Sequence, residues 1–119
     1  MSKRIEDDFQ KAVAKLLNTR YRKLLWFHTP NGGLRAKGEA KKFKLMGVKA
    51  GVPDVLILTP SVDLKYVGFA VELKMKKGRL SDEQKIWLEE LSKLGYKIYV
   101  CYDDIDELMK QLDEYYGLK

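Results

Sequence analysis

The sequence predicts an α/β fold in which a mixed sheet of about four strands is flanked by helices on both sides. Two observations lead to this prediction. Segments with apolar residues at helical spacing alternate with short apolar runs typical of strands, and the two central runs are joined by a turn without a helix between them. The predicted order is α-β-α-β-β-α-β-α. A length of 119 residues, 45% of them apolar, suits one domain with one core, spanning residues 1–119.

The first half of the chain is expected to contain two helices with a strand between them. Apolar residues recur at helical spacing over residues 3–19, which predicts an amphipathic helix. The apolar and aromatic run at 24–29 predicts a short strand. A second helix is expected over 35–46, with Phe43 and Met46 on its inner side and lysines facing outward.

The two central strands carry the charged residues on which the prediction of function depends. Residues 55–58 are four apolar residues between prolines, a pattern typical of a strand buried on both faces. In residues 68–75 alternate side chains face opposite sides, so Glu72 and Lys74 point the same way. A turn near residues 61–64 would make these strands an antiparallel hairpin, which places Asp54 roughly opposite Glu72.

The second half predicts a helix, a strand and a final helix. Ser81 begins the first of these helices with the pattern S-x-x-Q, a capping box completed by Gln84, and Gly95 ends it. Residues 97–102 form the next strand, and a strand-helix-strand unit of this length predicts a right-handed crossover to a parallel neighbour. The last helix, residues 105–116, is expected to cover the other face of the sheet.

Asp54, Glu72 and Lys74 together make a workable site for the hydrolysis of a phosphodiester. Two carboxylates are hard oxygen ligands that hold Mg²⁺, which keeps most of its waters and binds the substrate phosphate. The metal lowers the pKa of a bound water, and the lysine adds a second cation where negative charge develops. Burying these three charges without a metal would cost several kcal/mol per unpaired ion, so such a cluster is expected mainly where function requires it.

The strings GVPD, ELK and GRLSDEQKIWLEELSKLGYKIYVC resemble the VRR-NUC branch of the PD-(D/E)XK nuclease superfamily. Asp54, Glu72 and Lys74 match its P-D...E-x-K pattern one by one, and the similarity covers nearly the whole chain. The resemblance implies a restriction-endonuclease-like core and a Mg²⁺- or Mn²⁺-dependent DNA endonuclease acting on branched DNA such as Holliday junctions. Because a four-way junction has two-fold symmetry and two strands to cut, we expect a homodimer.

Further site residues are expected around this set. The Leu73 carbonyl is expected to join the two carboxylates as a metal ligand, and Lys74 to orient the attacking hydroxide or stabilise charge. The resemblance adds Glu6 as a metal ligand and Gln84 near the metal. Both also have a structural explanation, since the dipole of the first helix favours acids in its opening turns and Gln84 caps its own helix.

A basic face is expected to contact the phosphates of DNA. The net charge is +6 with a pI near 9.3, and residues 21–49 carry eight lysines and arginines but a single acid, whereas residues 103–114 are strongly acidic. A solvated lysine face and a plain turn at residues 30–33 are the structural alternatives. The residues expected to bind DNA are Asn31, Arg35, Lys41, Lys42, Lys44, Lys49, Lys76 and Arg79.

Composition excludes several other classes. His28 is the single histidine, which excludes multi-histidine metal sites and most zinc sites, and its place at a strand end favours a structural role. Cys101 lies in an apolar strand pattern and is expected in the core. No segment approaches ~18 consecutive apolar residues and no secretion signal is present, so we expect no membrane contact and a cytoplasmic, intracellular protein of bacterial or viral type acting in the host cell.

Two rival classes of function stay open. A restriction-type or flap-type nuclease is disfavoured because 119 residues leave little surface for base readout beyond the site itself. A catalytically idle DNA-binding module is disfavoured because every position of the Asp54, Glu72 and Lys74 set is filled.

Overall fold

A computed structural model defines the fold and describes the backbone of residues 2–30 and 37–118, with side chains for residues 5–30 and 41–118. Asn31 and Arg35 therefore lie outside the described residues. Helices and strands follow in the predicted order: α1 (Ser2–Thr19), β1 (Trp26–His28), α2 (Lys37–Leu45), β2 (Val55–Ile57), β3 (Gly68–Lys74), α3 (Asp82–Lys93), β4 (Tyr96–Tyr102) and α4 (Ile105–Tyr116).

The four strands form one mixed sheet in the order β1-β2-β3-β4. β1 pairs with β2 and β2 with β3 in antiparallel fashion, and β3 pairs with β4 in parallel. The predicted hairpin is therefore confirmed, and so is the predicted parallel pairing of the two strands joined through α3. β1 and β2 are shorter than expected, with three residues each, since the paired residues run only from Trp26 to His28 and from Val55 to Ile57.

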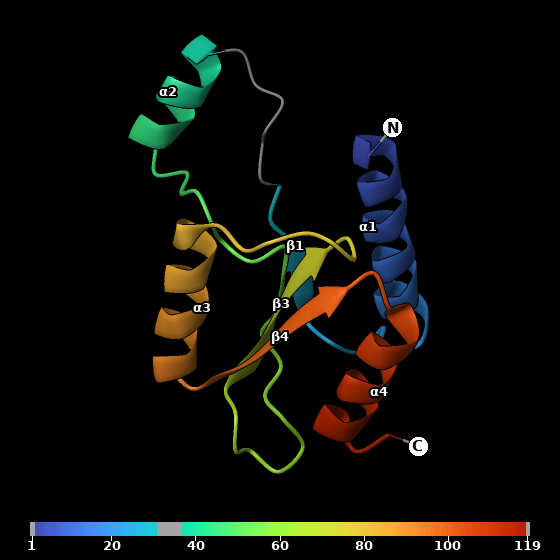
Figure 1. Cartoon of the computed structure of the whole chain (residues 1–119). Coiled ribbons are helices and arrows are strands. Elements are labelled where there is room, and N and C mark those ends of the chain that lie inside the picture. The colour runs from blue at the N-terminus through green and yellow to red at the C-terminus, as the bar shows by residue number, and fades with distance from the viewer. Residues whose placement is uncertain (1, 31–36, 119) are drawn as a thin grey trace.

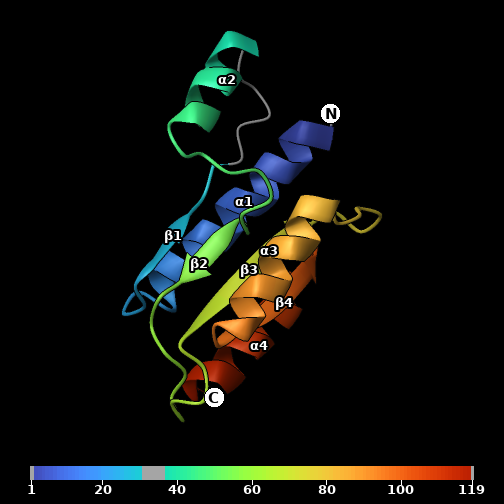
Figure 2. The ribbon, with the colours of Figure 1, turned by 90° about the vertical axis from the view of Figure 1, so that its left-hand side faces the viewer.

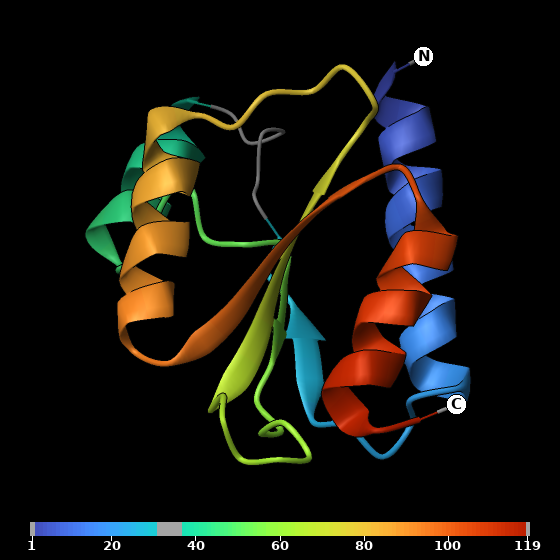
Figure 3. The ribbon, with the colours of Figure 1, turned by 60° about the horizontal axis from the view of Figure 1, so that its bottom comes forward.

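Helices cover both faces of this sheet. α1 and α4 lie side by side on one face, and α3 lies on the other (Figures 1 and 3). Val13 and Leu17 of α1 and Leu108 and Leu112 of α4 are buried against the sheet, where they meet the β2 and β3 residues Val55, Ile57, Phe69 and Val71. Cys101 is buried in the same core, as predicted.

A polar contact links α1 and the turn after it to α4. Arg20 Nη2 lies 2.9 Å from Asp113 Oδ2, and the Tyr21 hydroxyl lies 2.6 Å from Asp113 Oδ1. The hydrogen bond from Arg20 holds the pKa of Asp113 below its usual value, while burial and Asp113 raise the pKa of Tyr21 to about 12. The end of α1 is thereby fixed against α4.

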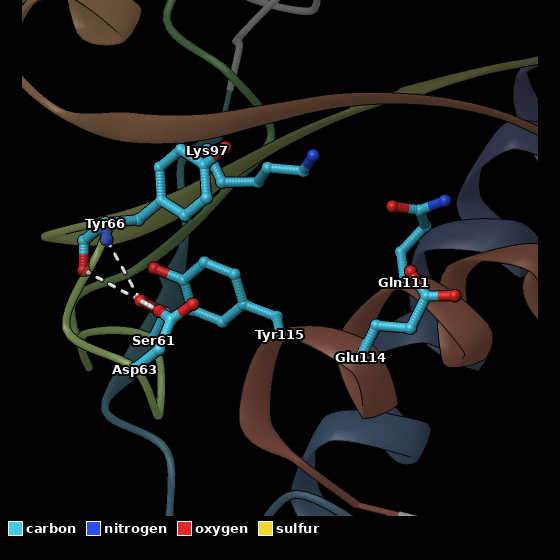
Figure 4. Close-up of a pocket in the computed structure, with 7 residues that line it drawn as sticks. All are labelled: Ser61, Asp63, Tyr66, Lys97, Gln111, Glu114 and Tyr115. Carbon is cyan, nitrogen blue, oxygen red and sulfur yellow. Dashed lines mark hydrogen bonds between the residues drawn. The ribbon is translucent and has the colours of Figure 1, made fainter.

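The turn between β2 and β3 lies at the end of the sheet opposite Asp54 and Glu72. Ser61 closes it: its Oγ donates to Asp63 Oδ1 at 2.7 Å and accepts the N–H of Tyr66 at 2.9 Å (Figure 4). Tyr66 stacks on Tyr115 of α4, with ring centroids 5.9 Å apart. The predicted turn is confirmed, and aromatic packing anchors it to α4.

α2 stands away from the layered body (Figures 1 and 2). Phe43 is half-buried as expected, but Met46 is exposed, which corrects its predicted inward position. The helical pattern alone implied a covered inner side, whereas in the described part of the chain Met46 is 68% exposed. Within the described residues, no helix is long and apolar enough to cross a bilayer.

Candidate active site

The carboxylates of Asp54 and Glu72 come together where β2 begins and β3 approaches its end. The β2–β3 register pairs Val55 with Val71, and one step further along the chain Asp54 faces Glu72. Both line a cavity of about 410 Å³, in which a hydrated cation and a phosphate group have room, since each water occupies about 30 Å³. The cavity is lined by Glu6, Asp7, Phe9, Gln10, Asp54, Glu72, Leu73, Lys74, Met75, Gly78, Arg79 and Gln84.

Asp54 is held in place through both its backbone and its side chain. Its Oδ2 accepts the N–H of Leu73 at 2.8 Å, and its carbonyl accepts the N–H of Thr29 at 2.9 Å. The Nδ1 of His28 lies 2.8 Å from the same carbonyl and must carry the proton, because a carbonyl only accepts. His28 therefore positions Asp54, in keeping with its predicted structural role.

The Leu73 carbonyl faces the same side as the Leu73 N–H, because both groups of one residue in an extended strand point to the same neighbour. Continuing the register, the residue opposite Leu73 is Pro53. Proline has no N–H to donate, so the ladder cannot supply a donor from that position to the Leu73 carbonyl. This arrangement leaves a backbone oxygen beside the Asp54 carboxylate.

Glu72 is a buried acid in which one carboxylate oxygen accepts a hydrogen bond and the other accepts none within the described part of the chain. Its side chain is 2% exposed; Oε2 accepts a hydrogen bond from Gln84 Nε2 at 3.1 Å and lies 4.0 Å from Lys74 Nζ. Among the described residues no hydrogen-bond donor reaches the buried Oε1. A buried acceptor without a partner costs about 1–3 kcal/mol, so this atom is where a ligand would be favoured.

The electrostatics of Glu72 also favour a cation. Burial and the neighbouring Asp54 carboxylate raise the pKa of Glu72 to about 8, and Lys74 offsets only part of this effect. A second positive charge between the two acids would lower that pKa and make both carboxylates available as ligands.

The donor set fits a hard divalent cation such as Mg²⁺ or Mn²⁺. Asp54, Glu72 and the Leu73 carbonyl supply oxygen only, and such cations accept water at their remaining positions. Across the described part of the chain, no three or more His, Cys, Asp or Glu side chains are grouped closely enough to hold a metal. Glu6 lines the same cavity from α1 but is exposed, so a ligand role for Glu6 stays a prediction.

Gln84 reaches the site from the first turn of α3. Ser81 is the N-cap, and the predicted capping box is present: Ser81 Oγ accepts the N–H of Gln84, and Gln84 Oε1 accepts the N–H of Ser81 at 2.8 Å. Because a backbone N–H only donates, this bond turns the amide oxygen to Ser81 and leaves Nε2 for Glu72. The same side chain therefore caps the helix and contacts the site.

Gln10 is a further residue of the site, four residues after Glu6 on the same face of α1. It lines the cavity, and its Nε2 is buried without a hydrogen-bond acceptor among the described residues. A polar side chain on the inner face of an amphipathic helix, one turn after an acid, was the available signal. The amide can donate to an oxygen of a ligand bound between α1 and β3.

The predicted DNA-binding residues divide into three groups. Arg79 lines the cavity itself, and Lys76 is exposed in the segment that follows β3. α2 and the segment after it lie at the same end of the molecule as the start of α1 (Figures 1 and 2). Their exposed lysines are Lys41, Lys42, Lys44 and Lys49. Asn31 and Arg35 fall outside the described residues.

A four-stranded mixed sheet between helices, with paired carboxylates and a following lysine at one end, defines a nuclease domain. The chain belongs to the VRR-NUC domain family, whose model matches residues 5–104. A solved structure described as a VRR_NUC domain protein superposes with a TM-score of 0.71 at 28% identity, covering 96% of this chain and 92% of that one. The resemblance and the fold class are confirmed.

Fanconi-associated nuclease 1 of Danio rerio is 43% identical over 54 residues, which is 45% of this chain. The matched part is 5% of that relative, so this chain spans a small fraction of its length. The relative is named as a nuclease, in agreement with the class that the fold and the site define.

Proposed function

We propose that this chain is a Mg²⁺- or Mn²⁺-dependent endonuclease that hydrolyses phosphodiester bonds of DNA, with preference for branched DNA such as Holliday junctions. The observation that carries the proposal is the buried Glu72 carboxylate, which has a free oxygen and lies beside Asp54. Acids with a purely structural role are rarely left in this state, because a buried oxygen without a hydrogen-bond donor costs about 1–3 kcal/mol.

The side chains around the two acids have distinct parts in this proposal. When bound, the cation would acidify a water and neutralise charge on the phosphate. Lys74, whose ammonium lies 4.0 Å from Glu72, would orient the attacking hydroxide or donate to a phosphate oxygen. Gln84 keeps Glu72 in its orientation, and Gln10 offers a further donor to the bound phosphate or to a water.

The preference for branched DNA and the homodimer are parts of the same proposal. One chain carries one Asp54–Glu72 site, whereas a four-way junction presents two equivalent strands. β1 is an edge strand, and its Phe27 and the preceding Leu25 are exposed, which makes a surface where two copies could meet. Light scattering should then give about twice the chain mass of 13.8 kDa, whereas the single-chain mass would argue against the dimer.

Digestion of a panel of end-labelled substrates tests the activity and its preference together. A four-way junction, a flap and a linear duplex of the same sequence are incubated with Mg²⁺, with Mn²⁺ and with EDTA. We expect metal-dependent cuts, faster on the junction than on the linear duplex. Cleavage that persists in EDTA would contradict the metal dependence. Equal cleavage rates on the junction and the linear duplex would contradict the preference for branched DNA. Tight binding without cleavage would favour the catalytically idle DNA-binding module.

A further inference from the structure

Three large apolar side chains lie in solvent at the end of α2. Leu45 is 81% exposed and Met46 is 68% exposed, and Val48 beside them is also exposed. Single exposed apolar residues are common on protein surfaces and need no explanation. Three within four positions, on an element that stands away from the body (Figure 2), make a compact apolar tip. We call residues 45–48 the α2 tip.

Backbone hydrogen bonds give the α2 tip a defined shape. Val48 N–H donates to the Phe43 carbonyl at 2.9 Å and Gly47 N–H to the Lys44 carbonyl at 3.1 Å, the paired bonds of a Schellman turn. Gly47 has φ of 102°, a conformation that favours glycine, although a Cβ there would meet nothing within 4 Å. Gly47 is thus suited to shaping the turn that presents Leu45 and Met46.

The charges around the α2 tip favour a polyanion as its partner. Residues 41–50 contain four lysines and no acid, and all four lysines are exposed: Lys41, Lys42, Lys44 and Lys49. A second copy of this chain has an acidic segment at residues 103–114 but a net charge of +6 overall, so a polyanion complements these lysines better than a second copy does. Apolar side chains between lysines match a nucleic acid, whose bases are apolar on their faces and whose phosphates flank them.

The α2 tip is tied to the active site through a short segment. A Cβ at Gly51 would lie 2.6 Å from the backbone of Glu83, so this segment packs directly on the first turn of α3, where Gln84 contacts Glu72. Val48 and Asp54 are six residues apart, which spans at most about 20 Å. One turn of duplex is about 34 Å, so the tip reaches bases within a turn of the cut phosphate.

We infer that Leu45 and Met46 form an apolar wedge that enters the base stack of DNA at a branch point, while the neighbouring lysines hold the phosphates on either side. Separating stacked bases in an intact duplex costs free energy at each step, and inserted leucine or methionine side chains separate bases in other DNA-binding proteins. At a branch the stacking is already interrupted, so the wedge enters there at lower cost and favours branched over linear DNA. The inference rests on the proposed cleavage of branched DNA and supplies its source of preference.

The test compares Leu45→Gln/Met46→Gln with Leu94→Gln. Leu94 is 69% exposed at the other end of α3, so it matches the tested residues in exposure without lying on the α2 tip. Polar replacement of exposed residues should leave the fold unchanged, which circular dichroism checks. We expect the ratio of the junction cleavage rate to the linear cleavage rate to fall at least about tenfold in the double variant, which corresponds to about 1.4 kcal/mol. Leu94→Gln should keep the ratio of the unmodified protein.

A second measurement detects the wedge without cleavage. In an Asp54→Asn background, a four-way junction with 2-aminopurine beside the branch should brighten when the protein binds, and this rise should vanish when both wedge residues are Gln. An unchanged cleavage ratio together with an unchanged fluorescence rise would overturn the inference. If the unmodified protein cleaves junctions no faster than duplex, the proposed preference fails, and the fluorescence still decides whether the wedge exists.

Two other outcomes would assign the α2 tip to a different partner and overturn the inference. If the double variant halves the mass in light scattering, the tip contacts a second copy. If the unmodified protein sediments with phosphatidylserine vesicles and the double variant does not, the tip binds anionic membranes.

Discussion

The side-chain amide of Gln84 donates to the buried carboxylate of Glu72 across 3.1 Å. Its oxygen is held by the N–H of Ser81 at 2.8 Å, so the cap of α3 fixes the direction in which the amide faces the site. Gln84 therefore both caps α3 and hydrogen-bonds Glu72, and mutation can separate these two roles.

Gln84→Ala should lower both stability and activity, whereas Ser81→Ala should lower stability alone. Loss of a helix cap costs about 1 kcal/mol of stability. Removing a side chain that hydrogen-bonds a metal-ligating acid typically lowers metal affinity or rate 10–100-fold. Thermal unfolding and cleavage rates as a function of Mg²⁺ concentration measure the two effects. Equal activity losses in the two variants would show that Gln84 acts only through the helix.

Glu72→Gln should stabilise the protein in EDTA at high pH. The pKa of Glu72 is raised from 4.5 to about 8, so the folded state holds a proton that the unfolded state releases. In metal-free protein the stability contributed by this group is present below pH 4.5 and is lost as the pH rises to about 8. The variant should lack this loss, which urea unfolding at pH 5 and pH 8.5 would detect as a flatter pH dependence.

With Mg²⁺ present, the unmodified protein should be more stable than Glu72→Gln. A cation that binds only the folded protein stabilises it by mass action, so the unmodified protein should gain several degrees in Tm while Glu72→Gln gains little. An equal gain in both proteins would place the metal elsewhere.

Asp113→Asn should destabilise the fold at neutral pH and matter less in acid. The hydrogen bond from Arg20 lowers the pKa of Asp113, so its contribution is present above its usual value of 3.8 and is lost as the pH falls through the lowered pKa. Because Arg20 is partly exposed and solvent screens the ion pair, we expect a small loss of stability at pH 7. Chemical unfolding of Asp113→Asn measures this loss of stability. Tyr21→Phe, which loses only the hydroxyl, is the comparison variant. A loss of stability in Asp113→Asn that grows as the pH falls would contradict the prediction.

The element order and the meeting of Asp54 with Glu72 could be predicted because both depend on local signals. Helical spacing, capping residues and turn residues mark each element, and counting from the turn placed the two acids opposite each other, which agrees with the Val55 and Val71 register. The capping role of Gln84 was visible as a capping box at the start of a helix, whereas its place near the site was implied only by the family resemblance.

The remaining features depend on contacts between distant segments. The unpartnered Oε1 of Glu72 and Nε2 of Gln10 result from how α1 and β3 pack, which spacing along the chain does not determine. Met46 was expected on a covered face, but a helical pattern does not say whether another element is there to cover it. The exposure of Glu6 has the same origin, since it depends on the tilt of α1 over the cavity.

Replacing Lys41, Lys42 and Lys44 with alanine should weaken binding to every DNA sequence alike. Each lysine that neutralises a phosphate contributes about one unit to the slope of log K against log salt, so the slope should flatten by about three. Fluorescence anisotropy at several salt concentrations measures it, with the exposed Lys110 of α4 replaced by alanine as the control. A slope equal to that of the control would place the DNA on another face.

The central claim is that Asp54 and Glu72 hold the cation that makes phosphodiester cleavage possible, and Asp54→Asn tests it most directly. Asparagine keeps an oxygen that can accept the Leu73 N–H, so the fold and DNA binding should persist while the charged ligand is lost. In single-turnover cleavage of an end-labelled four-way junction with saturating protein and Mg²⁺, we expect a rate at least ~10²-fold below that of the unmodified protein. Cleavage by purified Asp54→Asn at the unmodified rate would contradict the account.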